Sequence, residues 1–281
     1  VHDLAKQFGT PLFVYDETHL RSRCREAVSA FGPDSVIYAT KAFLCSAMAR
    51  LAHEEGLLLD VATGGELFVA LHAGVPAERC VMHGNNKSVA ELREAITAGV
   101  RHIVVDSFDE LDRIDALHRT GLVAPRVQLR ITPGVYVHTH EYVSTGQNDS
   151  KFGFNLANGD AQRAVARARA STSLQLVGLH CHIGSNVFET ENFSKAAEVM
   201  VRFANECGLS ELTLGGGLGV AYLNGETAPT ITEWATALRA ATKHLQGGVK
   251  VMVEPGRSIV ASAALTLYEV GTVKSIPGVR T

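Results

Sequence analysis

Short apolar runs rich in β-branched residues alternate with amphipathic stretches along most of the chain. The apolar runs have the length and composition of buried strands, and the amphipathic stretches repeat apolar residues at helical spacing. From residue 36 onward, eight such strand–helix units follow one another. We expect strands at 36–40, 57–63, 80–83, 102–106, 126–132, 174–183, 211–214 and 249–253.

Tandem strand–helix units imply parallel strands joined by right-handed crossovers. The closed arrangement of eight such units is a (β/α)8 barrel of the TIM type, so we expect an α/β fold with this barrel at residues 32–262. An open doubly wound sheet is the alternative that the pattern leaves. Before the barrel, residues 1–31 predict a short helix, a strand at 11–15 and a helix capped by Asp16. Residues 264–276 alternate like a strand that need not join the barrel sheet.

Nearly every predicted strand ends on an ionisable residue or on glycine, which is unusual for a random set of strand ends. The C-terminal strand ends of such a barrel, with the loops that follow them, form its active site. A lysine at one strand end is ordinarily a side chain that reaches solvent, but a whole ring of such ends predicts chemistry there. We interpret Lys41 as the reactive amine. The ring consists of Lys41, Asp60, His83, Asp106, Arg130, His182, Gly215 to Gly217, and Glu254.

The run Gly215-Gly216-Gly217, with Gly219 beyond it, follows the seventh predicted strand. Glycine reaches positive φ without strain, so backbone N–H groups in such a run can surround an anion. Barrels commonly bind a phosphate at this place. The G-x-x-x-x-G-K-[ST] pattern of nucleoside triphosphate sites is not found here. A phosphate-bearing cofactor is favoured, and a simple tight turn is the alternative.

Glu254 ends an otherwise apolar strand, and a buried carboxylate requires a partner. Arg257, three residues later, is one choice, and a protonated ring nitrogen of a ligand is the other.

His180 and His182 lie on one face of the sixth predicted strand, with Cys181 on the other. Together with His138 and His140 in the long loop at 133–158, they raise the question of zinc. No cluster has a complete ligand set at a recognised spacing, so we expect no metal. His182 suits stacking on a planar ring, and His180 is a core or supporting residue.

Composition excludes several classes of function. A formal net charge of −3 in 281 residues, with mixed signs, leaves no basic footprint for nucleic acid or for a membrane surface. No apolar run has the length of a membrane span. The five cysteines are scattered and odd in number, which favours reduced thiols and a cytoplasmic location.

Five motifs together resemble the alanine-racemase-fold decarboxylases, which use pyridoxal 5′-phosphate: YATKA at 38–42, DVATGGE at 60–66, HIGS at 182–185, LGGG at 214–217 and EPGR at 254–257. Three more resemble the diaminopimelate decarboxylases within that group: HGNNK at 83–87, HTHEYVSTG at 138–146 and DSKFGF at 149–154. The resemblance covers nearly the whole chain.

This resemblance implies roles for the ring of strand ends. Lys41 would bind the cofactor covalently, with the lowered pKa of a desolvated lysine. Glu254 would keep the ring nitrogen protonated, and His182 would stack on the ring. Arg257 would reach a substrate carboxylate. The implied cofactor-binding residues are Lys41, Asp60, His83, Arg130, His182, Ser185, Gly215, Gly216, Gly217, Glu254, Gly256 and Arg257, of which Lys41, His182 and Glu254 are catalytic.

The resemblance further implies decarboxylation of meso-diaminopimelate to L-lysine by a homodimer with active sites at the subunit interface. Its members have a second, β-rich domain with a CESGD-type motif, and that motif does not occur in this chain. We therefore expect residues 263–281 to begin such a domain and this chain alone to be a poor catalyst. A decarboxylase of ornithine, arginine or carboxynorspermidine is one alternative, and a non-catalytic regulatory homologue is another.

Overall fold

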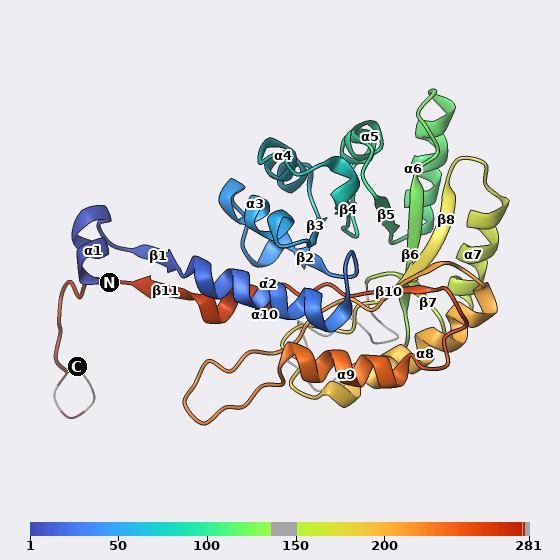
Figure 1. Cartoon of the computed structure of the whole chain (residues 1–281). Helices are drawn as coiled ribbons and strands as arrows, with labels where there is room; N and C mark the ends of the chain where they lie inside the picture. The colour runs from blue at the N-terminus through green and yellow to red at the C-terminus, as the bar shows by residue number, and fades with distance from the viewer. Residues whose placement is uncertain (136–150, 277, 279–281) are drawn as a thin grey trace.

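A sheet of parallel strands forms the centre of the molecule (Figure 1). The computed structural model describes residues 1–135, 151–276 and 278. Neighbouring strands pair in the order β10-β9-β8-β6-β5-β4-β3-β2, and a short strand β7 (Phe154–Asn155) pairs with β6. The barrel strands are β2 (Ile37–Ala39), β3 (Leu58–Val61), β4 (Cys80–Met82), β5 (His102–Val105), β6 (Arg126–Thr132), β8 (Gln175–His180), β9 (Glu211–Thr213) and β10 (Lys250–Met252).

Backbone contacts between the first and last of these strands close the ring. Val36 and Val253 form a parallel bridge, in which Ile37 N donates to Val253 O at 2.8 Å. Val253 N donates in turn to Ser35 O at 2.9 Å. The predicted (β/α)8 barrel is therefore confirmed, and the open sheet is wrong.

Helices surround the barrel, and their starts follow the capping signals of the sequence (Figure 1). The side chains of Thr63, Ser88 and Ser107 each accept a hydrogen bond from a backbone N–H three residues later, so each satisfies a donor that the helix leaves unpaired. The helices are α2 (Glu17–Phe31), α3 (Ser46–Glu54), α4 (Gly64–His72), α5 (Val89–Ala98), α6 (Phe108–Arg119), α7 (Asp160–Ala170), α8 (Thr190–Cys207), α9 (Ile231–Ala241) and the short α10 (Arg257–Val260). No helix in the described part of the chain is long and apolar enough to cross a membrane.

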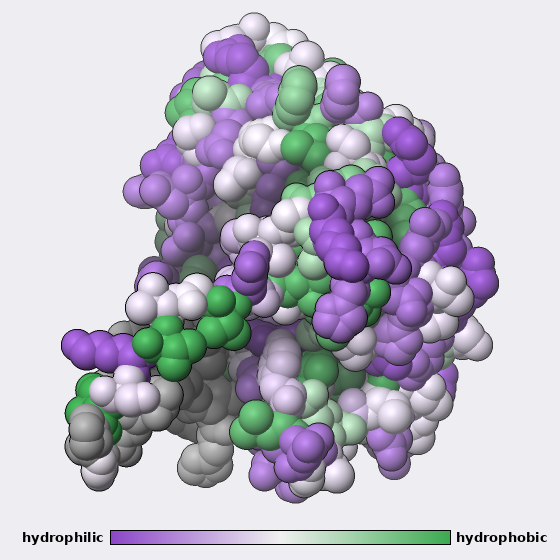
Figure 2. Space-filling view, turned by 90° about the vertical axis from the view of Figure 1, so that its left-hand side faces the viewer, coloured by the Kyte–Doolittle hydropathy of each residue, from purple (hydrophilic) through white to green (hydrophobic). Residues whose placement is uncertain are grey.

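A two-stranded ribbon projects from the barrel, beside helix α1 (His2–Phe8) (Figure 1). Strand β1 (Leu12–Tyr15) pairs antiparallel with β11 (Ala264–Leu267), so these two strands form a sheet of their own. A strand near residue 264 outside the barrel sheet agrees with the sequence, whereas its pairing with β1 was not predicted. Strand β11 is shorter than the predicted 264–276, because β1 offers only four partner residues. Figure 2 looks onto this side of the molecule and shows apolar side chains among polar ones on its surface. Phe13 and Leu265 of the ribbon are 66% and 55% exposed. The domain boundaries at 31 and 262 stay a prediction.

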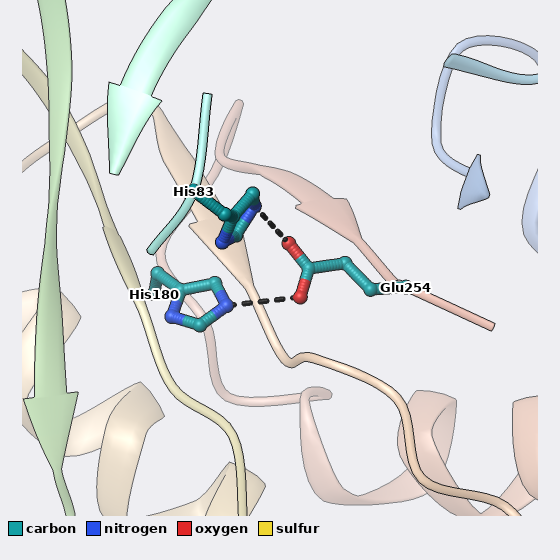
Figure 3. A group of neighbouring side chains, drawn as sticks. All are labelled: His83, His180 and Glu254. Atoms are coloured by element: carbon teal, nitrogen blue, oxygen red, sulfur yellow. Dashed lines mark hydrogen bonds and ion pairs between the residues drawn. The ribbon is translucent and has the colours of Figure 1, made fainter. Parts of the chain in front are cut away.

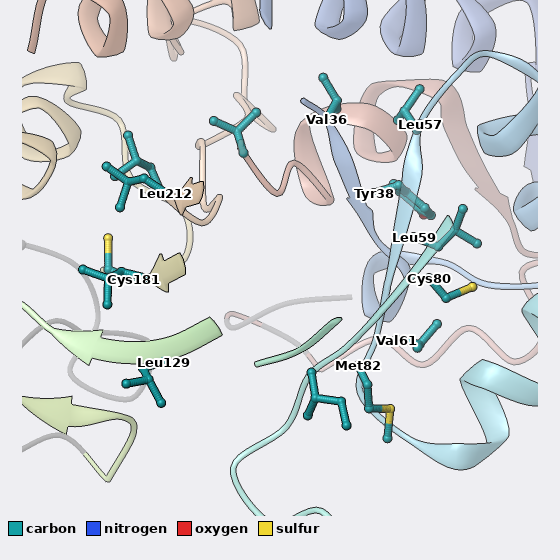
Figure 4. Packing of buried hydrophobic residues seen from close by; sticks show 14 of the residues in the cluster. Val36, Tyr38, Leu57, Leu59, Val61, Cys80, Met82, Leu129, Cys181 and Leu212 are labelled. Atoms are coloured by element: carbon teal, nitrogen blue, oxygen red, sulfur yellow. The ribbon is translucent and has the colours of Figure 1, made fainter. Parts of the chain in front are cut away.

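Two sets of apolar side chains form the core. The larger set lies between the strands and the helices and contains alternate strand residues such as Tyr38, Leu59 and Met82 (Figure 4). A separate cluster consists of Ile37, Leu58, Val81, Val104 and Met252, which come from five different strands. These five residues are out of phase with the larger set. Because side chains alternate along a strand, they fill the inside of the barrel.

Candidate active site

The alternation that places the inner apolar layer also places the polar layer above it. A residue two positions further along a strand points to the same side. Asp60, His83, Asp106 and Glu254 each stand two positions after an inner apolar residue, so they follow the same inward phase. Arg130 and His180, which are register partners on β6 and β8, follow the same inward phase. The side chains of this layer come from six strands or strand ends and meet near the C-terminal mouth of the barrel.

Lys41 lies in η1 (Thr40–Ala42), a 3-10 helix of one turn that directly follows β2. Its Nζ is 2.9 Å from Oδ2 of Asp60, whose side chain is 2% exposed, whereas the Lys41 side chain is 61% exposed. Burial lowers the pKa of Lys41, but the carboxylates of Asp60 and Glu254 outweigh burial and the pKa lies above its ordinary value. The expected lowering is therefore wrong for the chain without cofactor, because the sequence does not show how close the carboxylates come.

Glu254 lies among imidazoles (Figure 3). Its Oε2 accepts a hydrogen bond from His180 Nε2 at 3.0 Å, and its Oε1 is 2.9 Å from His83 Nε2. Burial by itself raises the pKa of the Glu254 carboxyl, but the two imidazoles more than offset it, and the pKa lies well below its usual range. The Glu254 side chain is therefore ionised at neutral pH.

The contact between His83 and Glu254 is close but not aligned as a hydrogen bond. Glu254 Oε1 and His83 Nε2 are both buried and have no hydrogen-bond partner within the described part of the chain. An anionic oxygen without a donor is costly to bury, so Oε1 suits a protonated nitrogen on a ligand. The alternative partner, Arg257, instead donates from Nη1 to Tyr222 Oη at 2.8 Å, and no ion pair joins it to Glu254 among the described residues.

The glycine run allows three backbone segments to approach closely. A Cβ on Gly216 would lie 1.9 Å from the backbone oxygen of Glu254, and one on Gly217 would lie 1.9 Å from that of Gly184. Gly217 also has a φ of +107°, which other residues rarely adopt. Gly216 N donates to His182 Nδ1 at 3.4 Å, so the turn after β9 contacts the residue expected to stack on a ring. The close approach is thus established, and phosphate binding by this turn stays a prediction.

Arg130, at the end of the layer formed by β5 and β6, contacts an acidic and an aromatic side chain. Its Nη1 lies 3.3 Å from Asp106 Oδ1, and its guanidinium is 4.4 Å from the centre of the Phe152 ring. Asp106 Oδ2 also accepts from Gly153 N at 3.0 Å, which ties the segment after residue 150 to the barrel.

Two cavities open at this mouth, and they share Lys41, His182, Ser185 and Glu254. One has a volume of about 460 Å³ and extends to Gly217, Gly256 and Arg257. The other, of about 400 Å³, extends to Asp60, His83 and Arg130. The two cavities thus bring together the predicted site residues, apart from Gly215 and Gly216, which stand just before Gly217 in the turn.

The structure shows a cluster of possible metal ligands and two tyrosines at the cavity that the sequence did not predict. The ligand atoms of His83, His180 and Glu254 all lie within 4.8 Å of one another, which is close enough for one metal ion. His138 and His140 lie outside the described residues. Tyr15 and Tyr222 line the larger cavity, and no periodic pattern pointed to them.

Lys87, from the HGNNK motif, is 2% exposed and does not line either cavity. Its Nζ lies 2.9 Å from Glu110 Oε1 and donates to Val104 O at 2.7 Å. This buried pair fixes the loop that follows His83 against β5 and α6.

A parallel barrel with a lysine, a buried carboxylate and a glycine turn around one cavity has the form of a barrel enzyme domain. Residues 17–261 match the family described as "Pyridoxal-dependent decarboxylase, pyridoxal binding domain". The chain belongs to this family, and its cofactor is pyridoxal phosphate.

Three relatives show where the chain lies within the family. It is 49% identical over 289 residues to the diaminopimelate decarboxylase of Mycobacterium tuberculosis, covering 97% of this chain and 65% of that protein. The structure of the M. jannaschii diaminopimelate decarboxylase with L-lysine has a TM-score of 0.91 at 33% identity, covering 98% of this chain and 67% of that one. Lysine/ornithine decarboxylase from Vibrio vulnificus with putrescine has a TM-score of 0.76 at 25% identity, covering 94% and 68%. The chain thus spans about 65% of the length of the mycobacterial protein.

Proposed function

We propose that this chain is the cofactor-binding part of an enzyme that converts meso-diaminopimelate to L-lysine and CO2. The observation that carries the proposal is the meeting of Lys41, His182 and Glu254 at one cavity, in a chain 49% identical to a diaminopimelate decarboxylase. Pyridoxal phosphate, when bound, supplies the electron sink for the electron pair left behind when an amino acid loses its carboxylate.

The residues around the cavities would hold this cofactor at both of its ends. Glu254 Oε1 suits the ring nitrogen, because this oxygen is buried and anionic and its 2.9 Å contact with His83 Nε2 is not aligned as a hydrogen bond. The glycine turn with Ser185, Gly256 and the start of α10 would bind the phosphate, since closely packed glycines expose backbone N–H groups. His182 would lie on the ring face, with a pKa that burial, Arg130 and Lys41 hold well below the ordinary value, so the imidazole is neutral.

Lys41 would hold the cofactor covalently through Nζ. An amine reacts with a carbonyl only after it loses its extra proton. Asp60 Oδ2, 2.9 Å away, stabilises the protonated amine and keeps Nζ at the cavity, so this pair must separate before Lys41 reacts. His83 and Arg130 would complete the cofactor site on the side of the second cavity.

Arg257 would bind a carboxylate of the substrate, for which its fork of donors is suited. It lines the larger cavity, and its guanidinium is held by a hydrogen bond to Tyr222, which lines the same cavity.

For the full-length protein we further propose a homodimer in the cytoplasm, with a β-rich second domain that completes the active site. The ribbon of β1 and β11, whose apolar side chains are exposed, is a reasonable start for that domain. Four of the five cysteines are buried and all are free, which agrees with a reducing compartment.

The main alternative is another amino-acid decarboxylase of the same fold. It is disfavoured by the lower similarity to the lysine/ornithine enzyme, with a TM-score of 0.76 against 0.91. A regulatory, non-catalytic homologue is disfavoured by the retained Lys41, His182 and Glu254.

The test is CO2 release by the full-length protein with pyridoxal phosphate, measured on meso-diaminopimelate, ornithine, arginine and carboxynorspermidine. We expect release from meso-diaminopimelate alone, with L-lysine as product. Faster release from another of these amino acids would reassign the substrate. A cofactor-loaded protein that releases no CO2 from any of them would favour the regulatory homologue.

A further inference from the structure

His180 is a buried imidazole that the proposed function leaves without a task. Its side chain is 1% exposed, and it lies at the end of β8, in the same layer as Glu254. Burial lowers the pKa of His180, so the ring is neutral and carries a single proton. A carboxylate can only accept a hydrogen bond. The 3.0 Å contact with Glu254 Oε2 therefore places that proton on Nε2.

The backbone fixes the direction of this N–H. Strand β8 is paired on both sides, with β6 and with β9, and His180 itself pairs with Arg130 and with Thr213. The ring also contacts that of His83 edge-on, with centroids 5.1 Å apart. Glu254, in contrast, is a long side chain with several rotatable bonds. The rigid partner in this pair is His180.

The two oxygens of Glu254 therefore have unequal surroundings. Oε2 accepts an aligned hydrogen bond from His180, whereas Oε1 lies 2.9 Å from His83 Nε2 without an aligned hydrogen bond among the described residues. If the carboxylate could rotate freely, neither oxygen would be reserved for a ligand. The hydrogen bond from His180 removes this freedom.

We propose that His180 is a positioning residue, whose Nε2–H holds Oε2 of Glu254 so that Oε1 is reserved for the ring nitrogen of the cofactor. This inference rests on the proposed role of Glu254. It assigns to His180 no contact with the cofactor or with the substrate. Other charged and titratable groups that line the cavity around Glu254 are Lys41, Asp60, His83, Arg130, Lys151 and His182.

The first test measures Glu254 directly in the chain without cofactor, by NMR of 13C-labelled glutamate carboxyls across a pH series. The Glu254 signal is identified by its loss in Glu254→Gln. His180→Leu removes the donor, His180→Gln keeps an N–H at a similar reach, and His102→Leu is the matched control. His102 is also 1% exposed and has no hydrogen-bond partner among the described residues.

We expect His180→Leu to raise the pKa of Glu254 by about one to two units, the effect of losing one hydrogen bond to a charged group. His180→Gln should restore most of the shift, and His102→Leu should leave the pKa unchanged. An equal pKa in His180→Leu and His102→Leu would overturn the proposal, as would a failure of His180→Gln to restore it.

A second measurement needs no variant, so it stands even if His180→Leu does not fold. Proton–nitrogen correlation spectra of the unmodified chain, recorded before and after a chelator is added, report the tautomer of His180. We expect the proton on Nε2. A proton on Nδ1 would overturn the proposal. So would an Nε2–H signal that is absent before chelator is added and appears with it, because a metal ion between His83, His180 and Glu254 would replace that proton.

The cofactor-loaded chain provides the functional readout. The visible absorbance of bound pyridoxal phosphate should change with pH differently in His180→Leu, and return to the unmodified profile in His180→Gln. If the absorbance of His180→Leu depends on pH as it does in the unmodified chain, His180 does not influence the ring nitrogen, and the inference is wrong. None of these measurements uses substrate, so a wrong substrate assignment would leave them unaffected.

Discussion

Replacing Glu254 by glutamine keeps the shape of the side chain and removes its charge. In Glu254→Gln the amide oxygen can still accept from His180 Nε2, so the hydrogen bond at 3.0 Å persists. The amide nitrogen then takes the place of Oε1. An N–H donor now faces the position reserved for a protonated ring nitrogen, and two donors cannot bond to each other.

The expected loss follows from this one contact. A hydrogen bond to a charged group contributes about 1.5–3 kcal/mol, and each 1.4 kcal/mol or so changes a rate about tenfold. Because the contact matters most when negative charge moves into the ring, we expect single-turnover decarboxylation to slow by roughly ten- to a hundredfold.

The assay is single-turnover CO2 release by the full-length protein, together with thermal unfolding. Glu211→Gln is the matched control. Glu211 is also a buried carboxylate inside the barrel, 6% exposed, and accepts from Arg126 and Gln128 at the opposite end. We expect Glu211→Gln to lower the melting temperature without slowing the chemistry. A Glu254→Gln protein that melts much lower yet decarboxylates at the unmodified rate would refute the role at the ring nitrogen and leave Glu254 as a structural anion.

Three further predictions concern single side chains. Lys41→Ala should abolish the adduct that borohydride fixes between chain and pyridoxal phosphate, with the fold intact by circular dichroism; an adduct mapped by mass spectrometry to another lysine would contradict the assignment. Lys87→Met should destabilise the chain by about 3–5 kcal/mol at pH 7, because it leaves Glu110 buried without its cation. Burial already raises the pKa of Glu110, so the loss of stability relative to the unmodified chain should be smallest below about pH 4 and grow as pH rises from there, which urea unfolding of both proteins across pH would measure. In the folded chain at pH 8, iodoacetamide should label Cys45 alone, because Cys45 is exposed and burial raises the pKa of thiols such as Cys181 to about 12; rapid labelling of Cys181, read by mass spectrometry, would show that the barrel opens.

The barrel and much of its site could be predicted because they depend on local patterns. Apolar strands alternating with amphipathic helices define the fold, and a period of two places Asp60 and His83 on the inner face. That same period also places His180 inside and in phase with Arg130. The sequence therefore contained enough information to place His180 in the polar layer at the mouth of the barrel, although only His182 was predicted to contact the cofactor.

What could not be predicted depends on closure of the barrel. The pairing of Glu254 with His180 joins β10 to β8 across the lumen, and no local pattern encodes such a distance. The raised pKa of Lys41 has the same origin, since two carboxylates from other strands outweigh burial. Tyr222 comes from a loop without periodicity, so its bond to Arg257 had no signal in the sequence.

The parallel bridge between Val36 and Val253 has a consequence for synthesis of the chain on the ribosome. At roughly 5–20 residues per second, about 10 to 40 s separate the appearance of these two residues. Throughout that time the free edge of β2 has no partner, and the unclosed apolar sheet is open to chaperones and to aggregation. The strand that closes the barrel also delivers Glu254, so no partly synthesised chain has the complete site.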